Sequence, residues 1–200
     1  MVITDAFGSD VTQNFEIVYK EGELKVYMYE LTITTRGASK TYDGIPLQNT
    51  YIEYDASALA ARGHELVYTM PSLTDAGSIS NTPSYTIMGQ DGKPVDKNLY
   101  DVRFDVGTLT VSPVKLTILT KSASKTYDGT ALRVDGYEIQ AGSLVSGQDI
   151  VSYKMNGSQT NVGSSEVWVT AIRIQNADGQ NVTRNYQITI KPGTLTVLAP

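Results

Sequence analysis

The sequence predicts an all-β protein built from tandem small β-sandwich domains of the immunoglobulin-like kind. Three observations carry this prediction: a long stretch occurs twice, apolar residues alternate with polar ones, and β-branched or aromatic residues fill the alternating runs. A period of two is expected of strands, because successive side chains point to opposite faces. Seven or so short strands in a unit of 85 residues are typical of a small sandwich.

The repeat is marked by one heptapeptide and one closing motif. Ala38–Gly44 reads Ala-Ser-Lys-Thr-Tyr-Asp-Gly and recurs unchanged as Ala123–Gly129, 85 residues later. A closing motif of the form Gly-x-Leu-x-Val begins at Gly22, at Gly107 and at Gly193. Self-similarity at a fixed period indicates a structural unit that occurs more than once.

Three segments follow from this alignment. We expect residues 1–30 to be the C-terminal portion of a preceding repeat, residues 31–115 to form one β repeat domain and residues 116–200 to form a second. The first segment is included because residues 3–22 match residues 174–193, so we expect a piece of a longer array. Only Ser112–Lys115 separate the last strand of one domain from the first of the next. Four residues with a proline make a stiff connection, which predicts a semi-rigid rod.

In residues 116–200, the alternation of apolar and polar residues predicts four strands. Leu116–Thr120 alternate, Val167–Ile174 form a long strand with a bulge, and Tyr186–Ile190 and Leu195–Val197 alternate again. Between the last two runs, Lys191–Gly193 predict a hairpin turn, because proline presets φ and glycine accepts a positive φ. The other copy begins in the same way at residues 31–34.

A single short helix is predicted. Ser57–Arg62 can form one or two turns that Gly63 ends. The counterpart at residues 142–147 contains glycine and valine, which are poor helix formers. The alternative is a β-grasp-like domain with one short helix, and that fold would need the helix in each unit.

Composition excludes several classes of function. The chain has 16 Lys and Arg against 21 Asp and Glu, without the basic patch of a nucleic-acid binder. It has no cysteine, which excludes disulfides, thiolate zinc sites and a cysteine nucleophile. No apolar run is long enough to span a bilayer, and no signal peptide opens the sequence. We predict no cofactor, metal, nucleic-acid partner or membrane insertion of this segment, and a monomer.

The motif Lys-Thr-Tyr-Asp-Gly has two interpretations, one functional and one structural. Tyrosine with a carboxylate is a combination that binds sugars or transfers protons. Asp-Gly is also a turn signal, and tyrosine anchors a turn through a ring that packs and a hydroxyl that bonds. Because both copies carry the motif, the sequence favours the turn.

Catalytic and metal sites are poorly supported. His64 is the only imidazole, its place in the other copy is taken by Gln148 or Asp149, and no Gly-x-Ser-x-Gly motif accompanies it. We therefore predict an exposed loop histidine. Carboxylate pairs for glycoside cleavage would come from Asp43, Glu53 and Asp55, with no spacing that indicates facing groups. Residues 176–181 and 90–92 have oxygen ligands around a glycine, too few for an EF-hand, and predict β-turns. We predict no catalytic, cofactor-binding or metal-binding residue.

Two further hypotheses concern a covalent bond and a sugar platform. Cysteine-free β-domains can be stapled by a Lys–Asn isopeptide bond, and the candidate pairs are Lys40 with Asn98 and Lys125 with Asn185. The alternative is that these asparagines cap turns through their side chains. Exposed aromatic rings could form a platform that binds carbohydrate, and the candidates are Tyr51, Tyr54, Tyr137 and Trp168. The alternative is that these side chains belong to the core, as tyrosine and tryptophan usually do in a small sandwich.

The linear order of four motifs resembles a known family. Lys-Thr-Tyr-Asp-Gly, Thr-x-x-Gly-Ser, Val-Thr-x-Asn-Tyr and Pro-Gly-Thr-Leu-Thr-Val are similar to the YDG/MBG-type repeats of large bacterial surface proteins. Residues 116–200 fit throughout, residues 31–115 depart around Asn98–Asp101, where an extra residue enters, and residues 1–30 fit as a partial unit. The resemblance implies secreted, often wall-anchored proteins whose units extend or present an adhesive region. It supplies no catalytic residue and no ligand site.

The sequence thus predicts a non-catalytic module that serves as a stalk or adhesion segment of a bacterial cell-surface protein. We expect an extracellular, cell-wall-associated location, with a host or matrix glycan or protein as partner through the parent protein. The alternative is a carbohydrate-binding accessory module of a secreted glycoside hydrolase.

Overall fold

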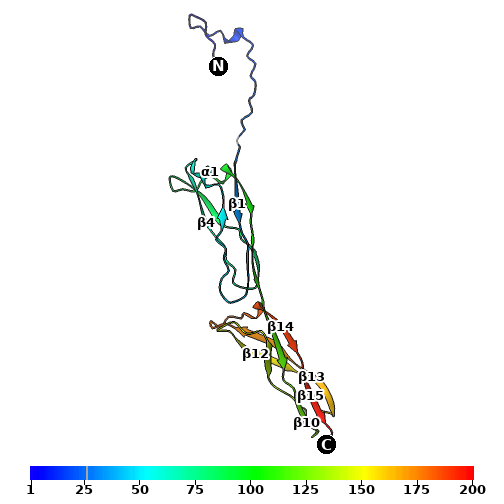
Figure 1. Cartoon of the computed structure of the whole chain (residues 1–200). Coiled ribbons are helices and arrows are strands. Elements are labelled where there is room, and N and C mark those ends of the chain that lie inside the picture. The colour runs from blue at the N-terminus through cyan, green and yellow to red at the C-terminus, as the bar shows by residue number, and fades with distance from the viewer. Residues whose placement is uncertain (26) are drawn as a thin grey trace.

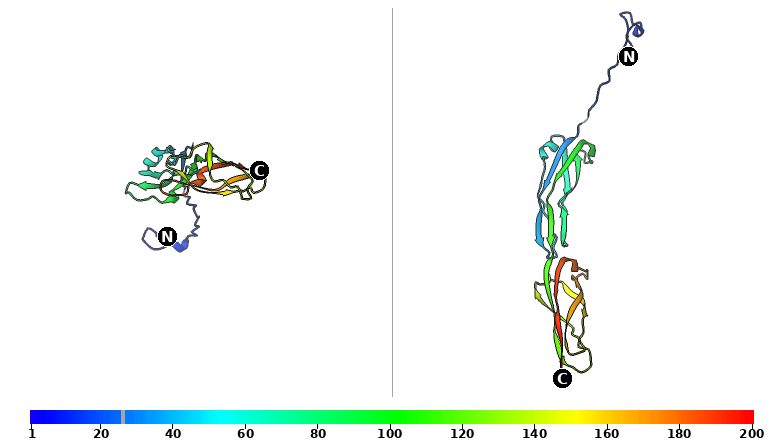
Figure 2. Two further views of the ribbon diagram at one scale, coloured as in Figure 1. Left: turned by 90° about the horizontal axis from the view of Figure 1, so that it is seen from below. Right: turned by 90° about the vertical axis from the view of Figure 1, so that its right-hand side faces the viewer.

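The computed structural model describes residues 1–25 and 27–200, and nearly all of its regular structure is β. Strands hold 49% of the residues and helices 7%, with one short α-helix in the described part of the chain. The predicted all-β, sandwich-like class is confirmed. An extended N-terminal arm leads into two elongated β bodies that lie end to end (Figure 1), and the right-hand view of Figure 2 shows the same order. Val26, the end of the first closing motif, lies outside the described residues.

We use three names for groups of elements: the arm before residue 29, unit 1 over residues 29–112 and unit 2 over residues 114–198. The domain boundaries given above stay predictions. The arm contains the 3-10 helix η1 (Thr12–Asn14). The elements of unit 1 are β1 (Tyr29–Thr35), β2 (Ala38–Thr41), β3 (Ile52–Glu53), α1 (Ala56–Ala60), β4 (His64–Thr69), β5 (Gly77–Ser80), β6 (Ser84–Gly89), η2 (Lys97–Leu99), β7 (Tyr100–Asp105) and β8 (Thr108–Ser112). The elements of unit 2 are β9 (Val114–Thr120), β10 (Ala123–Thr126), β11 (Tyr137–Ala141), β12 (Asp149–Asn156), β13 (Gly163–Gln175), η3 (Thr183–Asn185), β14 (Tyr186–Lys191) and β15 (Gly193–Leu198).

Unit 2 consists of two sheets. Unit 1 has a similar arrangement of strands, divided into two sheets and a separate pair of strands. The sheets of unit 2 have the strand orders β10-β15-β13-β12 and β11-β9-β14. Unit 1 has β3-β1-β7, β2-β8-β5 and the pair β4-β6. Where unit 2 has the continuous strand β13, unit 1 has β5 and β6 separated by residues 81–83. Pro83 lies in this gap, and proline has no N–H to continue a ladder of backbone hydrogen bonds.

The first and last strand segments of each unit pair in parallel along their length. In unit 1, β1 pairs with β7 and β2 with β8; in unit 2, β9 pairs with β14 and β10 with β15. The predicted hairpin at Lys191–Gly193 is therefore wrong, because β14 and β15 continue in one direction. Gly193 instead lies where its backbone passes very close to the backbone of Lys121. A Cβ at this residue would lie 2.2 Å from the carbonyl oxygen of Lys121, where the chain passes from one sheet to the other.

The alternation of apolar residues is confirmed. Leu116, Ile118 and Thr120 in β9 are each at most 1% exposed. The predicted bulge in the long strand β13 is also present. The pairing of β13 with β12 shifts register twice, and Ala171 has a φ of +53°.

The helix and the connection between the units are shorter than predicted. Helix α1 overlaps the predicted segment Ser57–Arg62 but begins one residue earlier. Asp55 caps it, because its Oδ1 accepts a hydrogen bond of 2.9 Å from the amide of Ala58. Residues 142–147 of unit 2 form no helix, which argues against the β-grasp alternative. Only Pro113 separates β8 from β9. Among the described residues, no helix is long and apolar enough to cross a membrane.

Two apolar clusters form the interior. One lies within unit 1 and includes Leu31, Ile33 and Tyr100. The other fills unit 2 and continues into the end of unit 1, where Tyr42 and Val111 belong to it. Unit 1 therefore has a cluster of its own, and its other end shares buried apolar surface with unit 2.

The arm adopts the same local loop as its matching segment in unit 2. The amide of Ile3 donates to Thr12 Oγ1 at 2.8 Å, and the amide of Ile174 donates to Thr183 Oγ1 at the same distance. The residue before each 3-10 helix has nearly the same φ, −114° in the arm and −113° in unit 2. This loop geometry is therefore set locally by the Val-Thr motif.

Candidate functional site at the joint between the units

The two Tyr-Asp-Gly motifs form identical turns. Asp43 Oδ1 accepts a hydrogen bond of 2.9 Å from the amide of Ile45 and one of 2.5 Å from Lys40 Nζ, and Gly44 has a φ of +80°. These bonds, with that from lysine largest, hold the pKa of the Asp43 carboxyl below its usual range. Gly129 has a φ of +82°, so glycine is required at both positions. The turn interpretation of the motif is confirmed.

The second copy repeats these contacts. Asp128 Oδ1 accepts from Lys125 Nζ at 2.6 Å and from the amide of Thr130 at 2.9 Å. The same cause lowers the pKa of the Asp128 carboxyl. Oδ1 of each carboxylate thus bonds within its own turn.

The two turns differ in what covers them. Tyr42 is 5% exposed because its turn meets unit 2, whereas Tyr127 lies at the other end of unit 2 and is 43% exposed. We call the contact around Tyr42 the joint. It joins Tyr42, Asp75 and Ala76 of unit 1 to Gln148, Asn185 and Tyr186 of unit 2.

A buried glutamine links two tyrosines across the joint. Gln148 Nε2 donates to the hydroxyl of Tyr42 at 2.9 Å, and the hydroxyl of Tyr186 donates to Gln148 Oε1 at 2.6 Å. The amide of Val145 also donates to the Tyr186 hydroxyl, at 2.9 Å. The two rings pack edge to face with centroids 6.1 Å apart, and burial raises the pKa of Tyr186. Both polar ends of Gln148 are therefore satisfied in an interior that is shared by the two units.

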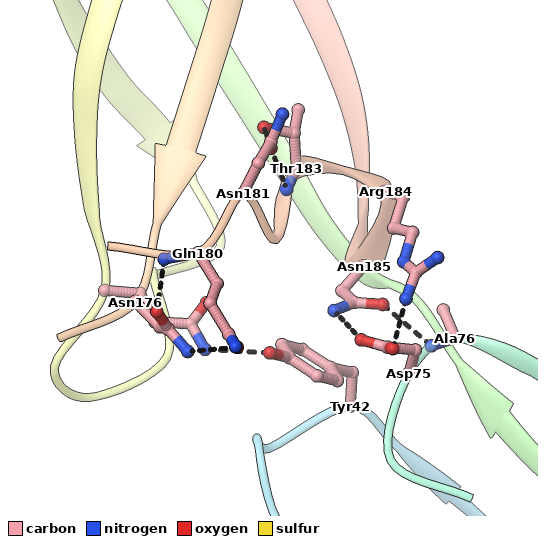
Figure 3. A network of polar contacts seen from close by, with 10 residues as sticks. Tyr42, Asp75, Ala76, Asn176, Gln180, Asn181, Thr183, Arg184 and Asn185 are labelled. Atoms are coloured by element: carbon pink, nitrogen blue, oxygen red, sulfur yellow. Dashed lines mark hydrogen bonds and ion pairs between the residues drawn. The ribbon is translucent and has the colours of Figure 1, made fainter. Parts of the chain in front are cut away.

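A carboxylate and an amide form the second link (Figure 3). Asn185 Nδ2 donates to Asp75 Oδ1 at 2.8 Å, and Asn185 Oδ1 accepts from the amide of Ala76 at 2.8 Å. Arg184 forms an ion pair with Asp75 Oδ2. The bond from the Asn185 amide, and then the bond and charge of Arg184, lower the pKa of Asp75. Asn185 is fully buried, so its amide is held in one orientation.

A polar cleft of about 580 Å³ opens beside these contacts. Its lining includes Asp43, Asp75 and Asp178 with the turn at residues 176–180. In residues 1–25 and 27–200, no group of three His, Cys, Asp or Glu side chains is placed to hold a metal ion. Asp43 is paired with Lys40 of its own turn, whereas Asp75 is paired with Arg184 of the other unit.

The structure corrects the prediction for His64. It is the first residue of β4 and half-buried, and not part of an exposed loop. Its Nδ1 lies 2.8 Å from the hydroxyl of Tyr100. This contact corresponds to that between Gln148 and Tyr186 in unit 2. The histidine therefore forms a hydrogen bond with Tyr100 near the end of unit 1 that faces the arm.

The three carboxylates considered for catalysis are not brought together. Asp43 lies at the joint, whereas Glu53 and Asp55 line a shallow depression elsewhere on unit 1. Glu53 accepts a hydrogen bond of 2.6 Å from the hydroxyl of Tyr51, and Asp55 begins α1.

The two loops considered for calcium form turns, as predicted. Gly179 donates its amide to the carbonyl oxygen of Asn176 at 2.9 Å and has a φ of +76°. In the other loop Asp91 Oδ1 accepts from the amide of Lys93 at 3.1 Å, and Gly92 has a φ of +72°.

The isopeptide pairs are contradicted by strand register. Lys125 lies opposite Val197, whereas Asn185 directly precedes the residue opposite Val114. Eleven residues of strand separate these levels, or roughly 35 Å at the usual rise per residue. Lys40 and Asn98 are separated in the same way by the ladder of β1 and β2 with β7 and β8. Each lysine instead bonds the carboxylate of its own turn.

The four nominated aromatic residues do not form one platform. Tyr51 lies under Arg36, whose guanidinium carbon is 4.0 Å from the ring centroid, and Tyr54 packs on Tyr68. Tyr137 packs on Tyr153 with centroids 5.0 Å apart. Trp168 is 37% exposed in β13. The first two belong to unit 1 and the others to unit 2.

Sequence reasoning missed the partners of the joint. Gln148 was named only as the counterpart of His64, and Asn185 only as a candidate for an isopeptide bond. The signal that was available is the pair Asn185–Tyr186, which recurs in the arm as Asn14–Phe15. Comparison with protein-family models, with curated proteins and with solved structures finds no match to this chain.

Proposed function

We propose that this chain is a non-catalytic, extracellular segment of a bacterial cell-surface protein and serves as a stalk or adhesion module. The observation that carries the proposal is the joint. A shared apolar cluster, the buried Gln148 and the Asp75–Asn185 contact resist rotation of one unit against the other. Units held end to end gain reach, and reach requires no chemistry in each unit.

The likeness of four ordered motifs to YDG/MBG-type repeats supports the location. In that setting the duplicated heptapeptide marks a tandem repeat, and the parent protein would meet a host or matrix glycan or protein. The wall-associated location rests on this likeness, and the stalk rests on the joint.

Small-angle X-ray scattering tests the stalk. We expect the profile of one elongated particle, with the two units in a fixed order and orientation. A compact particle, or a profile that needs two independently tumbling bodies, would contradict the proposal. The matched variant is Asn185→Ala, which removes both bonds of the amide and should broaden the distribution of shapes while each unit stays folded.

Labelling of intact cells tests the location. Antibodies against the purified chain should bind source cells whose membranes are unbroken. Labelling that requires permeabilised cells would overturn the surface assignment and leave the result from scattering unaffected.

A carbohydrate-binding accessory module is the second candidate, and one observation favours it. Unit 1 has a groove of about 390 Å³ whose lining includes Tyr85, Pro94 and Tyr100. Tyr85 is 38% exposed and packs edgewise on Phe104 with centroids 5.6 Å apart. Exposed rings stack on sugars. Saturable binding on a glycan array that is lost in Tyr85→Ala would favour this function over the stalk.

A further inference from the structure

The two units carry opposite charge on equivalent sheet faces. We call the solvent-facing side of the sheet β3-β1-β7 in unit 1 the acidic face, and that of the sheet β11-β9-β14 in unit 2 the basic face. Buried and less buried residues alternate along β1 and β9, so the burial pattern shows which side chains point outward. Each face runs along the side of its unit.

The acidic face has more carboxylates than cations. Arg103 is the one cation on its three strands, and it pairs with Glu30 at 3.1 Å and with Asp101 at 2.8 Å. At the margin of the face, the charges of Asp55 and Arg36 offset each other. Four carboxylates against one guanidinium give the face a net charge of −3: Glu30, Glu53, Asp101 and Asp105.

The basic face has the opposite balance. Lys115 and Lys121 share the outward side of the course of β9, and Lys191 of β14 lies opposite Leu119. Glu138 of β11 lies opposite the same leucine and is the one carboxylate of these strands. The three lysines are exposed, and none of the ion pairs among the described residues uses them. Three lysines against one glutamate give a net charge of +2.

Two positions of the repeat have reversed their charge. Glu30 of β1 corresponds to Lys115 of β9, 85 residues later. Asp105 and Lys191 also correspond, since each stands two residues before the glycine of its closing motif. The strands and their pairing are the same in both units, so the reversal changes the charge of the face and leaves its shape. Interfaces place a positive patch against a negative one in this way.

Both faces look to the same side of the chain. Only Pro113 separates β8 from β9, and alternate residues of an extended chain point to opposite sides. Val111 of β8 and Lys115 of β9 therefore point in one direction. Leu109 and Val111 are at most 1% exposed and point from their sheet into unit 1, towards the sheet β3-β1-β7. This is the direction in which the acidic face looks.

We propose that the acidic face of unit 1 docks on the basic face of unit 2 in a second copy of this chain. A two-fold axis places the copies antiparallel, so that each acidic face meets a basic face and both contacts form at once. Such an arrangement closes and gives a dimer, in place of the monomer that the sequence predicts. It goes beyond the proposed function because it needs no surface location, and no residue of the joint takes part in it.

The dimer should be weak and sensitive to salt. Three strands of about six residues cover roughly 20 Å by 14 Å. Two such contacts bury on the order of 1,100 Å² in total, at the lower limit for specific interfaces. The charges are exposed, and salt limits the reach of exposed charges to about 30 Å at 0.01 M and to about 3 Å at 1 M.

Sedimentation equilibrium of the full chain at millimolar concentration tests this docking. We expect twice the mass of the 21.7 kDa chain at about 0.01 M salt, and the mass of the single chain at about 1 M. Two double variants sharpen the test. Lys115→Glu with Lys191→Glu leaves two acidic faces, and Glu30→Lys with Asp105→Lys leaves two basic faces. Each variant alone should dimerise at least tenfold more weakly than the parent chain.

An equimolar mixture of the two variants should restore the dimer, because every face again meets its opposite. Each reversal changes the charge by two, so the variants have net charges of −9 and −1. Both stay negative, and overall attraction between them does not explain a restored dimer.

Lys154→Glu with Arg173→Glu is the control. It also has a net charge of −9, but its two changes lie on exposed positions of β12 and β13, in the other sheet of unit 2. This variant should dimerise as the parent chain does. Amide spectra establish that every variant is folded. A parent chain that stays single at about 0.01 M salt overturns the proposal. So does a mixture that fails to associate, or an assembly of more than two chains.

Discussion

At the scale of single residues, the repeated heptapeptide forms the same turn in both units, but its tyrosine is buried in only one of them. The heptapeptide at Ala38–Gly44 and Ala123–Gly129 forms the same turn twice, because the turn depends on an aspartate, a lysine and a glycine within a few residues. The tyrosine of the motif differs. Tyr42 is buried by unit 2, and Tyr127 is not. Local chemistry therefore fixes the turn, and the neighbouring unit fixes what the tyrosine does.

Removal of one hydroxyl should separate these roles. Tyr42→Phe leaves Gln148 Nε2 buried without its acceptor, and an unsatisfied buried donor costs about 1–2 kcal/mol. Trp168 is the only tryptophan and lies in unit 2, so its fluorescence during urea unfolding reports the stability of that unit. Tyr127→Phe is the matched control and should change the free energy of unfolding by less than about 0.5 kcal/mol. Equal losses in both variants would contradict the role of Tyr42.

Asp75 should make the joint sensitive to acid. Its pKa is lowered in the folded chain by Asn185 and Arg184. The stabilisation is therefore fully present above the ordinary aspartate pKa of about 3.9 and is lost as the pH falls through the lower folded value. The difference in unfolding free energy between the parent chain and Asp75→Asn should be largest near pH 7 and shrink below pH 4.

Asp178→Asn provides the control for this titration. It removes a carboxylate from the same cleft and leaves the Asp75 contacts in place. A difference between the parent chain and Asp75→Asn that does not change with pH would mean that the charge of Asp75 adds nothing to the joint.

At the scale of elements, the strands that were predicted rest on alternation, which is a local pattern. Leu116 and Ile118 alternate with residues that are less buried, and the sequence shows this directly. The hairpin at Lys191–Gly193 was not predictable in the same way. Proline and glycine are typical of turns, yet Gly193 is needed where its backbone nearly touches that of Lys121, 72 residues earlier. Contacts between distant segments, such as Asp75 with Asn185, leave no periodicity to read.

Glycine substitution tests this account of the crossing. Gly193→Ala places a Cβ 2.2 Å from a backbone oxygen, and backbone cannot move aside as a flexible side chain can. We expect unit 2 to lose about 3 kcal/mol or more in urea unfolding followed by Trp168 fluorescence. Gly22→Ala is the control, since Gly22 holds the matching place in the arm and has open space around its Cβ position. A tolerated Gly193→Ala would contradict the close approach of Gly193 to the backbone of Lys121.

At the scale of the whole molecule, the joint connects the two units by side-chain contacts as well as by the chain. A single residue, Pro113, connects them, and the apolar cluster of unit 2 extends across the connection. The predicted rod was argued from a short connection alone. The contacts that hold the orientation became visible only once both units were folded.

Distance measurements between spin labels should show this stiffness. The chain has no cysteine, so Glu65→Cys and Lys154→Cys provide two labels without background, one on each unit. We expect one narrow distance distribution by pulsed electron paramagnetic resonance. Asn185→Ala together with Tyr42→Phe should broaden it. A broad distribution in the chain without these two changes would contradict a rigid joint.

The parallel pairing of first and last strand segments also decides how a unit bears tension. The chain enters each unit at one end of its long axis and leaves at the other end. The first and last strand segments lie side by side and point in the same direction. A pull on the two termini slides these strands past each other, so the backbone hydrogen bonds of the ladder share the load at once and do not open one by one. The order of strands that misled the hairpin prediction thus gives each unit mechanical resistance along its length.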